Sequence, residues 1–444
     1  ARVGELEATQ FSTTTKLKGV ATFVIGANSF GGNARQGLAD AFLNSPASLR
    51  DGDLANGIPA TGWASGGNGT KRARAAAAQS GATTFNYDLK LFLDTSFTGK
   101  DLLRTVLRAG NFGKSAFGGD GYVGLDALEV AFQEPDGGKD VLGVNRLFYQ
   151  FPLGSSFTAT VGGVVRQDDM LAVWPSAYPA DTILDFFTYA GSPATYNLGL
   201  GAGGGIWWES NDFSISANYV SNNGFNSNPN EGGIATNGAG SNGTVQIAYA
   251  PENWGLAAAY NYASKNADSV GQLNGTPLSA AFTDNGNSSS FGLSAWWTPE
   301  ESGWVPSISA GYGYNSITDG DDTLVFRSAT TQSWYVGLQW ADAFLKGNTL
   351  GMAVGQPSFV TNVEYRNDFN DSNSFVADGN YAWEWWYQFQ VTDNISVTPA
   401  IYYLSRPYGD ITNGQDRTFG GNRNDNRNNQ FNNFGGLLKT TFKF

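Results

Sequence analysis

The chain has 444 residues, of which 15% are charged and 14% aromatic, and its net charge is −13. It has no cysteine and no histidine, which excludes disulfides, zinc sites with nitrogen or sulfur ligands, and catalysis by an imidazole base. The acidic balance argues against a nucleic-acid partner, and no apolar run approaches the roughly 18 residues that a membrane-spanning helix needs. A Ser–Lys or carboxylate mechanism remains formally open, but we expect no enzyme, no cofactor and no metal site.

Alternation of apolar and polar residues at every second position is the strongest pattern in the sequence. Between Phe213 and Tyr219, four apolar residues alternate with Ser214, Ser216 and Asn218. Successive side chains of a β-strand point to opposite sides, so this period indicates a strand whose two faces meet different solvents. The pattern favours strands with one face toward lipid and the other toward water.

Sixteen strands are predicted in chain order. The first eight lie near residues 17–27, 83–94, 102–112, 140–151, 156–167, 195–208, 212–221 and 243–250. The second eight lie near 254–264, 289–298, 304–315, 332–341, 349–356, 379–391, 395–405 and 433–444. The number depends on the short segment 349–356, and on Val123 to Phe132, which is assigned to a loop because counting it would disturb the order of the turns.

The connections between these strands alternate in length. Short turns follow the even-numbered strands, as at Ala250-Pro251-Glu252-Asn253, where proline and asparagine suit a tight reversal. Long loops follow the odd-numbered strands and include 28–82, 113–139, 168–194, 222–242, 265–288 and 406–432. This asymmetry is typical of transmembrane barrels, which have short periplasmic turns and long outer loops.

The sequence therefore predicts an all-β fold, a transmembrane antiparallel up-and-down β-barrel of sixteen strands. Barrels of this size enclose an aqueous channel, so the strand number favours transport. Backbone groups in hydrocarbon must be paired, and we expect strand 17–27 to lie beside strand 434–444. We assign residues 17–444 to one barrel domain and residues 1–16 to a periplasmic connector. The alternative reads loop 222–242 as a linker between two domains.

Charged residues decide which face of a strand points inward, because a lysine at the bilayer midplane costs roughly 2–4 kcal/mol. On the second strand this rule directs Phe85, Tyr87, Leu89, Leu91 and Leu93 toward lipid. It directs Asn86, Asp88, Lys90, Phe92 and Asp94 toward the lumen.

The same rule predicts a charged constriction of the pore. Strands three to five carry four arginines that turn inward as a basic ladder: Arg104, Arg108, Arg146 and Arg166. Loop 168–194 follows strand five directly and carries the carboxylates Asp168, Asp169, Asp181 and Asp185. We expect this loop to fold into the lumen, so that opposed charges line the narrowest point and favour small polar or charged solutes.

Two features of this site have a second interpretation. The arginines could merely neutralise wall carboxylates such as Asp88 and Asp94. The aromatic residues of loop 168–194 could stack on sugar faces or could pack the loop against the wall; they are Trp174, Tyr178, Phe186, Phe187 and Tyr189.

Both ends of the sequence are similar to those of a known family. The opening Phe11-Ser12-Thr13-Thr14-Thr15-Lys16-Leu17-Lys18-Gly19 with Phe23-Val24-Ile25-Gly26-Ala27, and the close Leu437-Leu438-Lys439-Thr440-Thr441-Phe442-Lys443-Phe444, resemble cyanobacterial outer-membrane porins of the carbohydrate-selective (OprB-type) and iron uptake porin family. Phe444, Phe442 and Leu438 match the terminal segment that the assembly machinery of such families reads, and Thr440 departs from it.

The resemblance implies an integral outer-membrane protein, in contact with lipid, that assembles as a homotrimer. In that family a surface-layer-homology module precedes the barrel and grips the peptidoglycan-linked wall polymer. The sequence has no counterpart of it, and Ala1-Arg2-Val3 is neither an initiator nor a signal peptide, so we interpret the chain as a processed product or a fragment. Wall anchoring is then expected of the missing part.

The function that we expect is passive diffusion of small hydrophilic solutes and inorganic ions. The alternative is a substrate-selective sugar or iron uptake channel with a binding site in the lumen. An energy-coupled receptor fits less well because the chain lacks a plug-sized N-terminal domain, and a barrel enzyme or an adhesin fits least.

Overall fold

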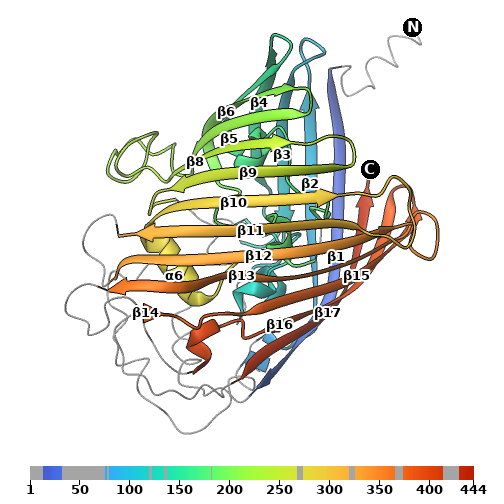
Figure 1. Cartoon of the computed structure of the whole chain (residues 1–444). Coiled ribbons are helices and arrows are strands. Elements are labelled where there is room, and N and C mark those ends of the chain that lie inside the picture. The colour runs from blue at the N-terminus through green and yellow to red at the C-terminus, as the bar shows by residue number, and fades with distance from the viewer. Residues whose placement is uncertain are drawn as a thin grey trace.

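The computed structural model describes residues 14–32, 76–77, 80–119, 123–134, 138–181, 183–267, 274–319, 326–365, 374–413 and 430–444. Their strands form one antiparallel sheet that closes on itself (Figure 1). The closure joins β1 (Thr15–Gly32) to β17 (Phe431–Lys443), with Val20 opposite Lys443 and Ile25 opposite Leu438. The predicted pairing of the first and last strands is confirmed.

Every other strand pairs with its neighbours in sequence. They are β2 (Thr84–Thr95), β3 (Leu102–Gly110), β4 (Gly143–Leu153), β5 (Phe157–Arg166), β6 (Leu200–Ser210), β7 (Phe213–Ser221), β8 (Ser241–Tyr249), β9 (Trp254–Ala263), β10 (Asn287–Trp297), β11 (Ser307–Thr318), β12 (Phe326–Ala341), β13 (Thr349–Tyr365), β14 (Ser374–Phe375), β15 (Tyr381–Thr392) and β16 (Ile395–Ser405). Because β13 also pairs directly with β15, the two-residue β14 adds nothing to the closed wall. The predicted all-β barrel of sixteen strands is confirmed.

Each of the sixteen predicted segments coincides with one of these strands, although some limits differ. Strands β12 and β13 extend beyond the predicted segments 332–341 and 349–356. Three register shifts interrupt their pairing between Phe326 and Trp334, and a bulge breaks the period-two pattern on which the prediction depended. Strand β6 begins at Leu200, later than predicted. Its first residues are rich in glycine and show no alternation, so the sequence does not indicate where the strand starts. The piece from Val123 to Phe132 forms no barrel strand, as predicted.

The two faces of the wall differ as the alternation requires. Outward-facing residues such as Leu256 and Leu293 are 52% and 58% exposed, whereas the inward-facing Asn261 and Ser290 are fully buried. On β2, the exposed Phe85 and the buried Asp88 confirm the predicted directions of that strand. The outward-facing Trp254 and Trp297 are paired near the short turns, where membrane barrels carry an aromatic girdle.

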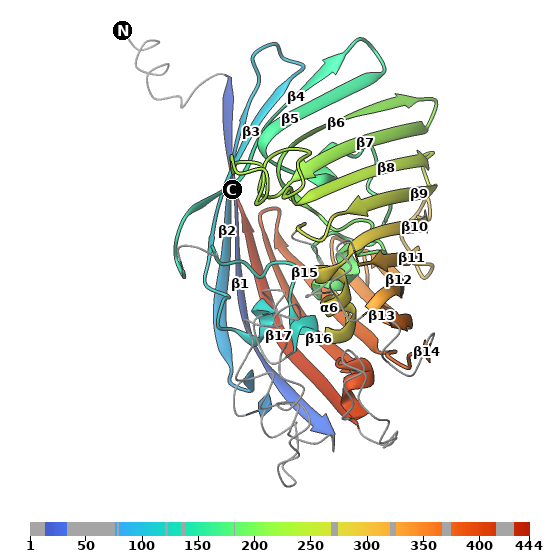
Figure 2. The same cartoon turned by 90° about the vertical axis from the view of Figure 1, so that its left-hand side faces the viewer.

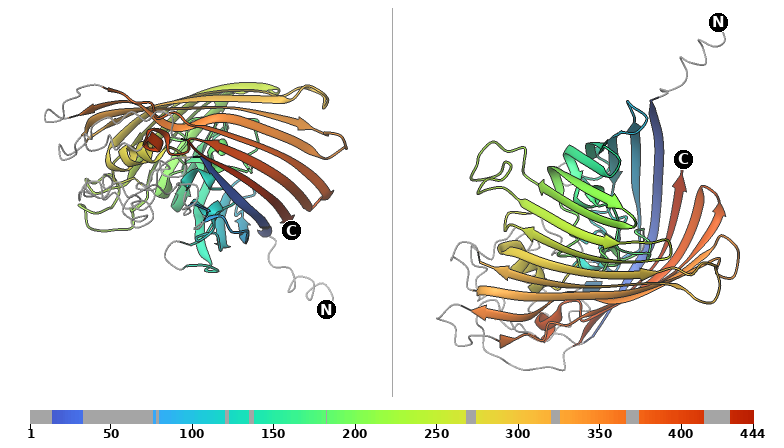
Figure 3. Two further views of the ribbon diagram at one scale, coloured as in Figure 1. Left: turned by 90° about the horizontal axis from the view of Figure 1, so that it is seen from below. Right: turned by 45° about the horizontal axis from the view of Figure 1, so that its top comes forward.

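Several loops fold into the barrel instead of extending from its rim. Figure 2 shows the helix α6 (Pro277–Asn285) and the segments that follow β3 and β5 lying within the curve of strands. Figure 3 shows the same curved wall from two further directions, with the end of β17 beside the start of β1. No helix among the described residues is long and apolar enough to cross a membrane.

The predicted domain assignment can be compared with the structure only where residues are described. Most of the predicted connector 1–16 and the loop segments 33–75 and 414–429 lie outside the described residues. Strand β1 already includes Thr15 and Lys16. Loop 222–242 joins two adjacent wall strands, β7 and β8, which pair along their whole length from Phe213 to Tyr249.

Candidate functional site

The β5–β6 loop, residues 167–199, runs along the inside of the barrel wall. Hydroxyl groups at inward-facing wall positions bind its backbone. Ser216 of β7 accepts from Ala172 N at 3.0 Å, Ser309 of β11 accepts from Ala177 N at 2.9 Å, and Ser333 of β12 donates to Gly191 O at 2.9 Å. These contacts fix the loop to wall strands from β7 to β12.

The wall admits this loop because its inward positions are small. A Cβ atom at Gly311 would lie 1.8 Å from Ala190 O, and one at Gly337 would lie 2.6 Å from the ring of Tyr178. Both distances are shorter than real Cβ contacts, so any larger residue would displace the loop. Gly191, at the crossing of β11, has φ +77°, a left-handed conformation that glycine adopts without strain.

Glu384 of β15 fastens the middle of the loop. Its carboxyl group accepts from Tyr178 Oη at 2.8 Å and from Leu184 N at 2.7 Å, and the residue is completely buried. Trp386, on the same face of β15, donates from Nε1 to Tyr178 Oη at 2.9 Å. A buried acceptor that satisfies two donors of one loop holds that loop firmly, because a buried donor without its partner costs free energy.

The described parts of the β3–β4 loop, residues 111–119, 123–134 and 138–142, pack against the β5–β6 loop inside the lumen. Asp185 N donates to Ala127 O at 2.9 Å, and Glu129 N donates to Ile183 O at 3.2 Å. Buried side chains of both loops and of α6 form one apolar cluster with the inner wall; they include Phe117, Leu125, Leu128, Phe186, Phe187, Leu278 and Phe282. The lumen is therefore narrowed by a folded layer of loops.

Asp126 attaches the β3–β4 loop across the closure of the barrel. Its carboxyl group accepts from Asn28 Nδ2 of β1 at 2.8 Å and from Asn433 Nδ2 of β17. Burial raises the pKa of Asp126 to about 8, although these hydrogen bonds oppose the shift. The loop is thus held to both strands that complete the sheet.

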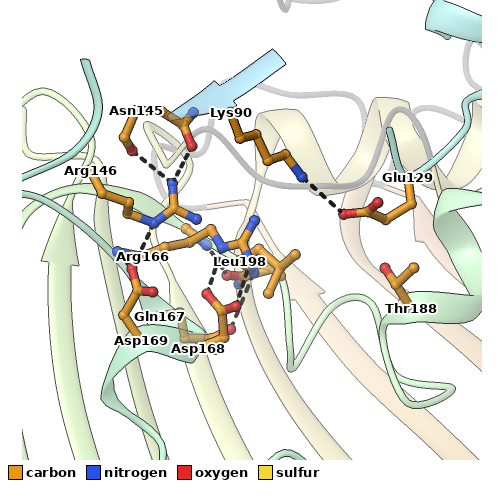
Figure 4. A network of polar contacts seen from close by, with 12 residues as sticks. Lys90, Glu129, Asn145, Arg146, Arg166, Gln167, Asp168, Asp169, Thr188 and Leu198 are labelled. Carbon is orange, nitrogen blue, oxygen red and sulfur yellow. Dashed lines mark hydrogen bonds and ion pairs between the residues drawn. The ribbon is translucent and has the colours of Figure 1, made fainter. Parts of the chain in front are cut away.

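The four predicted arginines lie on β3, β4 and β5, and each is paired with an aspartate. Arg104 binds Asp94 in a bidentate pair at 2.8 and 3.0 Å, and Arg108 binds Asp88 at 2.9 and 2.7 Å. Arg146 Nε contacts Asp169 at 2.7 Å, and Arg166 contacts Asp168 at 2.5 Å, as Figure 4 shows. Two of the arginines thus neutralise wall carboxylates, which was the second interpretation of the ladder.

The carboxylates of the β5–β6 loop are arranged differently from the expectation of charges opposed across a hole. Asp168 and Asp169 lie in the 3-10 turn that directly follows β5, so they pair with arginines on their own side. The Asp185 carboxylate accepts from Asn274 and Tyr189, and burial raises its pKa to about 6. Asp181 is exposed, and its backbone carbonyl accepts from Lys439 Nζ at 2.5 Å.

Glu129 of the β3–β4 loop is the carboxylate that does face the basic side, and sequence analysis missed it. Its Oε1 lies 3.8 Å from Lys90 Nζ (Figure 4). Burial raises the pKa of Glu129, but four surrounding cations hold it below its ordinary value; they are Lys90, Arg108, Lys439 and Arg166. Nothing in the loop sequence shows which way Glu129 points, so only the predicted inward direction of Lys90 hinted at this pair.

The aromatic residues of the β5–β6 loop are mostly buried. Tyr178, Phe186, Phe187 and Tyr189 are at most 5% exposed. Trp174 packs against Tyr196 with ring centroids 5.5 Å apart. These rings pack the loop against the wall, which leaves little ring surface for stacking on a sugar.

A closed sixteen-stranded barrel whose lumen is narrowed by inward loops has the architecture of porin-type outer-membrane barrels. No protein-family model matches the chain. It is similar to two uncharacterized cyanobacterial proteins, alr4550 of Nostoc sp. (26% identical, covering 100% of this chain and 68% of that protein) and sll0772 of Synechocystis sp. (28% identical, covering 74% and 61%). The chain thus spans about two thirds of the length of these relatives.

Among solved structures, the chain is similar to OprB of Pseudomonas putida. The TM-score is 0.54 at 11% identity, and the match covers 100% of this chain and 97% of that one. At this identity the likeness shows the fold alone.

Proposed function

We propose that the chain is a passive outer-membrane channel for small hydrophilic solutes and inorganic ions. The observation that carries this proposal is that three charged side chains inside the barrel remain partly open to solvent, although Arg108 and Arg146 beside them are buried. Lys90, Glu129 and Arg166 keep 24%, 21% and 29% of their side-chain surface accessible. Ionised groups remain in such a lumen only if water reaches them, since burial without solvent costs several kcal/mol.

The narrowest part of this channel lies, in our proposal, between two sides of different chemistry. The basic side comprises Lys90, Arg108, Arg146 and Arg166 with their paired aspartates, and the loop side presents Glu129. Cations near a carboxylate create a field across the opening, which orders water and favours polar solutes over apolar ones. Asp185, in contrast, is bonded within the loop layer, and Asp181 is bonded through its backbone carbonyl to Lys439 of β17.

Conductance across a planar lipid bilayer tests the proposal. We expect the purified chain to give steady ohmic steps that scale with salt concentration. Silence under conditions in which the barrel is folded would contradict it. Block of the steps by millimolar sugar or by iron salts would favour the alternative, a substrate-selective sugar or iron uptake channel with a lumen site.

Passive diffusion is preferred over the sugar-selective alternative because the loop aromatics are buried. Membership in the OprB-type or iron uptake porin family, assembly as a homotrimer and anchoring to the peptidoglycan-linked polymer are further proposals that rest on the resemblance of the chain ends. They concern the whole protein, since the relatives are longer than this chain.

A further inference from the structure

A second charged cluster lies at the short-turn end of the barrel, which in membrane barrels faces the periplasm. A cavity of about 420 Å³ opens there, and its lining includes Lys18, Val20, Phe92, Asp94, Arg104 and Lys443. This volume falls within the range of small-molecule sites. None of these residues takes part in the contacts that hold the loop layer.

The strand register brings the charged groups together. Arg104 of β3 lies opposite Asp94 of β2, and Lys18 of β1 lies opposite Phe92 of β2. Lys443 of β17 lies opposite Val20 of β1, across the closure of the sheet. Three cations on three strands therefore share one cavity with a single side-chain carboxylate, in a chain whose net charge is −13. Phe444 also lines the cavity, and its main-chain carboxyl oxygen accepts from Gly19 N at 2.7 Å.

The Asp94 side chain does not pair closely with all three cations. Asp94 takes two hydrogen bonds from Arg104, whereas Lys18 Nζ is 3.7 Å from Asp94 Oδ2 and its side chain is 63% exposed. The Lys443 ammonium makes no hydrogen bond or ion pair with any residue that the structure describes. Arg104 uses two of its five N–H groups on Asp94, so donors remain for a ligand.

We propose that this cavity is a binding subsite for a small oxyanion, the carboxylate or phosphate group of a solute at the periplasmic exit of the pore. Lys18, Lys443 and the remaining N–H groups of Arg104 bind the anion, and Val20 and Phe92 provide an apolar surface for the rest of the solute. The Arg104 guanidinium lies 5.8 Å from the Phe92 ring centroid, which holds it beside that surface. Only the direction of passage rests on the proposed function.

The position of the cavity suits this role. Lys90 of β2 and Arg108 of β3 lie opposite each other. This pair is four residues away from the pair of Asp94 and Arg104, on the same inward faces. The basic groups thus continue from the narrow part of the lumen to the exit. An anion that has passed Arg108 next meets the cavity, where an unpaired lysine is available.

Calorimetric titration of the folded barrel in detergent with inorganic phosphate, at fixed ionic strength, tests the subsite. The double variant Lys18→Gln with Lys443→Gln should bind phosphate at least about tenfold more weakly, since two charge-assisted contacts are lost. Lys346→Gln is the matched control, because it removes an exposed lysine from a turn at the same end but outside the cavity. Heat-dependent migration on a gel verifies that each variant is folded.

Unchanged binding in the double variant would overturn the subsite, and so would an equal loss in the control, which would indicate a general charge effect. Bilayer conductance of the same samples separates the two proposals. A conducting channel without phosphate binding contradicts the subsite alone. Binding that depends on Lys18 and Lys443 in a barrel that does not conduct supports the subsite and contradicts the proposed function.

Discussion

Replacing Glu384 by alanine should release the β5–β6 loop from the wall without opening the barrel. The substitution removes the acceptor for Tyr178 Oη at 2.8 Å and for Leu184 N at 2.7 Å. A buried donor without a partner costs about 1–3 kcal/mol, so two donors weaken the attachment by roughly 2–6 kcal/mol. At the lower end of that range, the population of the detached loop rises about thirtyfold. The wall itself persists, because β15 pairs with β13 and β16 through its backbone.

Single-channel recording and the size limit for uncharged polymers measure this effect. We expect Glu384→Ala to show larger and noisier conductance states and a higher size limit. Glu384→Gln keeps one acceptor oxygen and should show a smaller change. Gln388→Ala is the matched control on the same strand and face, since among the described residues the Gln388 side chain donates only to the exposed Gln390. Conductance and a size limit equal to those of the parent would refute the argument that Glu384 fastens the loop.

Three further predictions concern the charges, the wall and the pH dependence. Neutral replacement of Arg108, Arg146 and Arg166 together should raise the preference for cations, measured as a reversal potential in a salt gradient, because Asp88, Asp168 and Asp169 lose their arginine partners. Unaltered selectivity would show that these groups lie away from the ion path. Gly311→Val should displace the loop and increase conductance, because a Cβ would lie 1.8 Å from Ala190 O, whereas Gly436→Val, with no atom within 4 Å of its Cβ, should leave it unchanged. Because the pKa of Asp126 is raised from 3.8 to about 8, its stabilisation of the β3–β4 loop is complete below pH 3.8 and is lost as the pH rises through about 8. Protease cleavage of that loop should therefore be faster at pH 9 than at pH 5, and Asp126→Asn should abolish the difference.

The barrel wall could be predicted because the residues of each strand alternate according to the solvent that each face of that strand meets. Period-two alternation depends only on which residues meet lipid, so the sixteen strands follow without tertiary information. The need to pair backbone groups in hydrocarbon places the first strand beside the last, but the register that sets Ile25 opposite Leu438 was not predicted. The prediction was less complete where a bulge shifts the period, as between Gln332 and Trp334 of β12.

For the site, the sequence could predict only which side chains point into the lumen, and not which groups they contact there. The inward face of Glu384 follows from alternation, but its bond with Tyr178 joins residues 206 positions apart, which no local pattern encodes. Glu129 is set by packing between two loops and has no signal of its own. The aspartates after β5 were predicted to lie across the lumen from the arginines, yet a 3-10 turn of four residues keeps them beside Arg166. Short-range chain geometry therefore overrode the expected long-range opposition of charge.

A difference between two parts of the wall explains where the loop layer lies. Inward positions of β2 to β4 carry long charged side chains such as Lys90, Arg108 and Arg146, which pair with carboxylates of the wall and of the loops. Inward positions of β7 to β12 carry serine and glycine, which let loop carbonyls approach and offer hydroxyl partners. In the sequence, the charged residues and the serine and glycine residues both look like the hydrophilic face of a strand that lines a lumen. Size and charge separate them: small residues mark the wall to which the β5–β6 loop is bound through its backbone, and long charged residues mark the wall where ion pairs form.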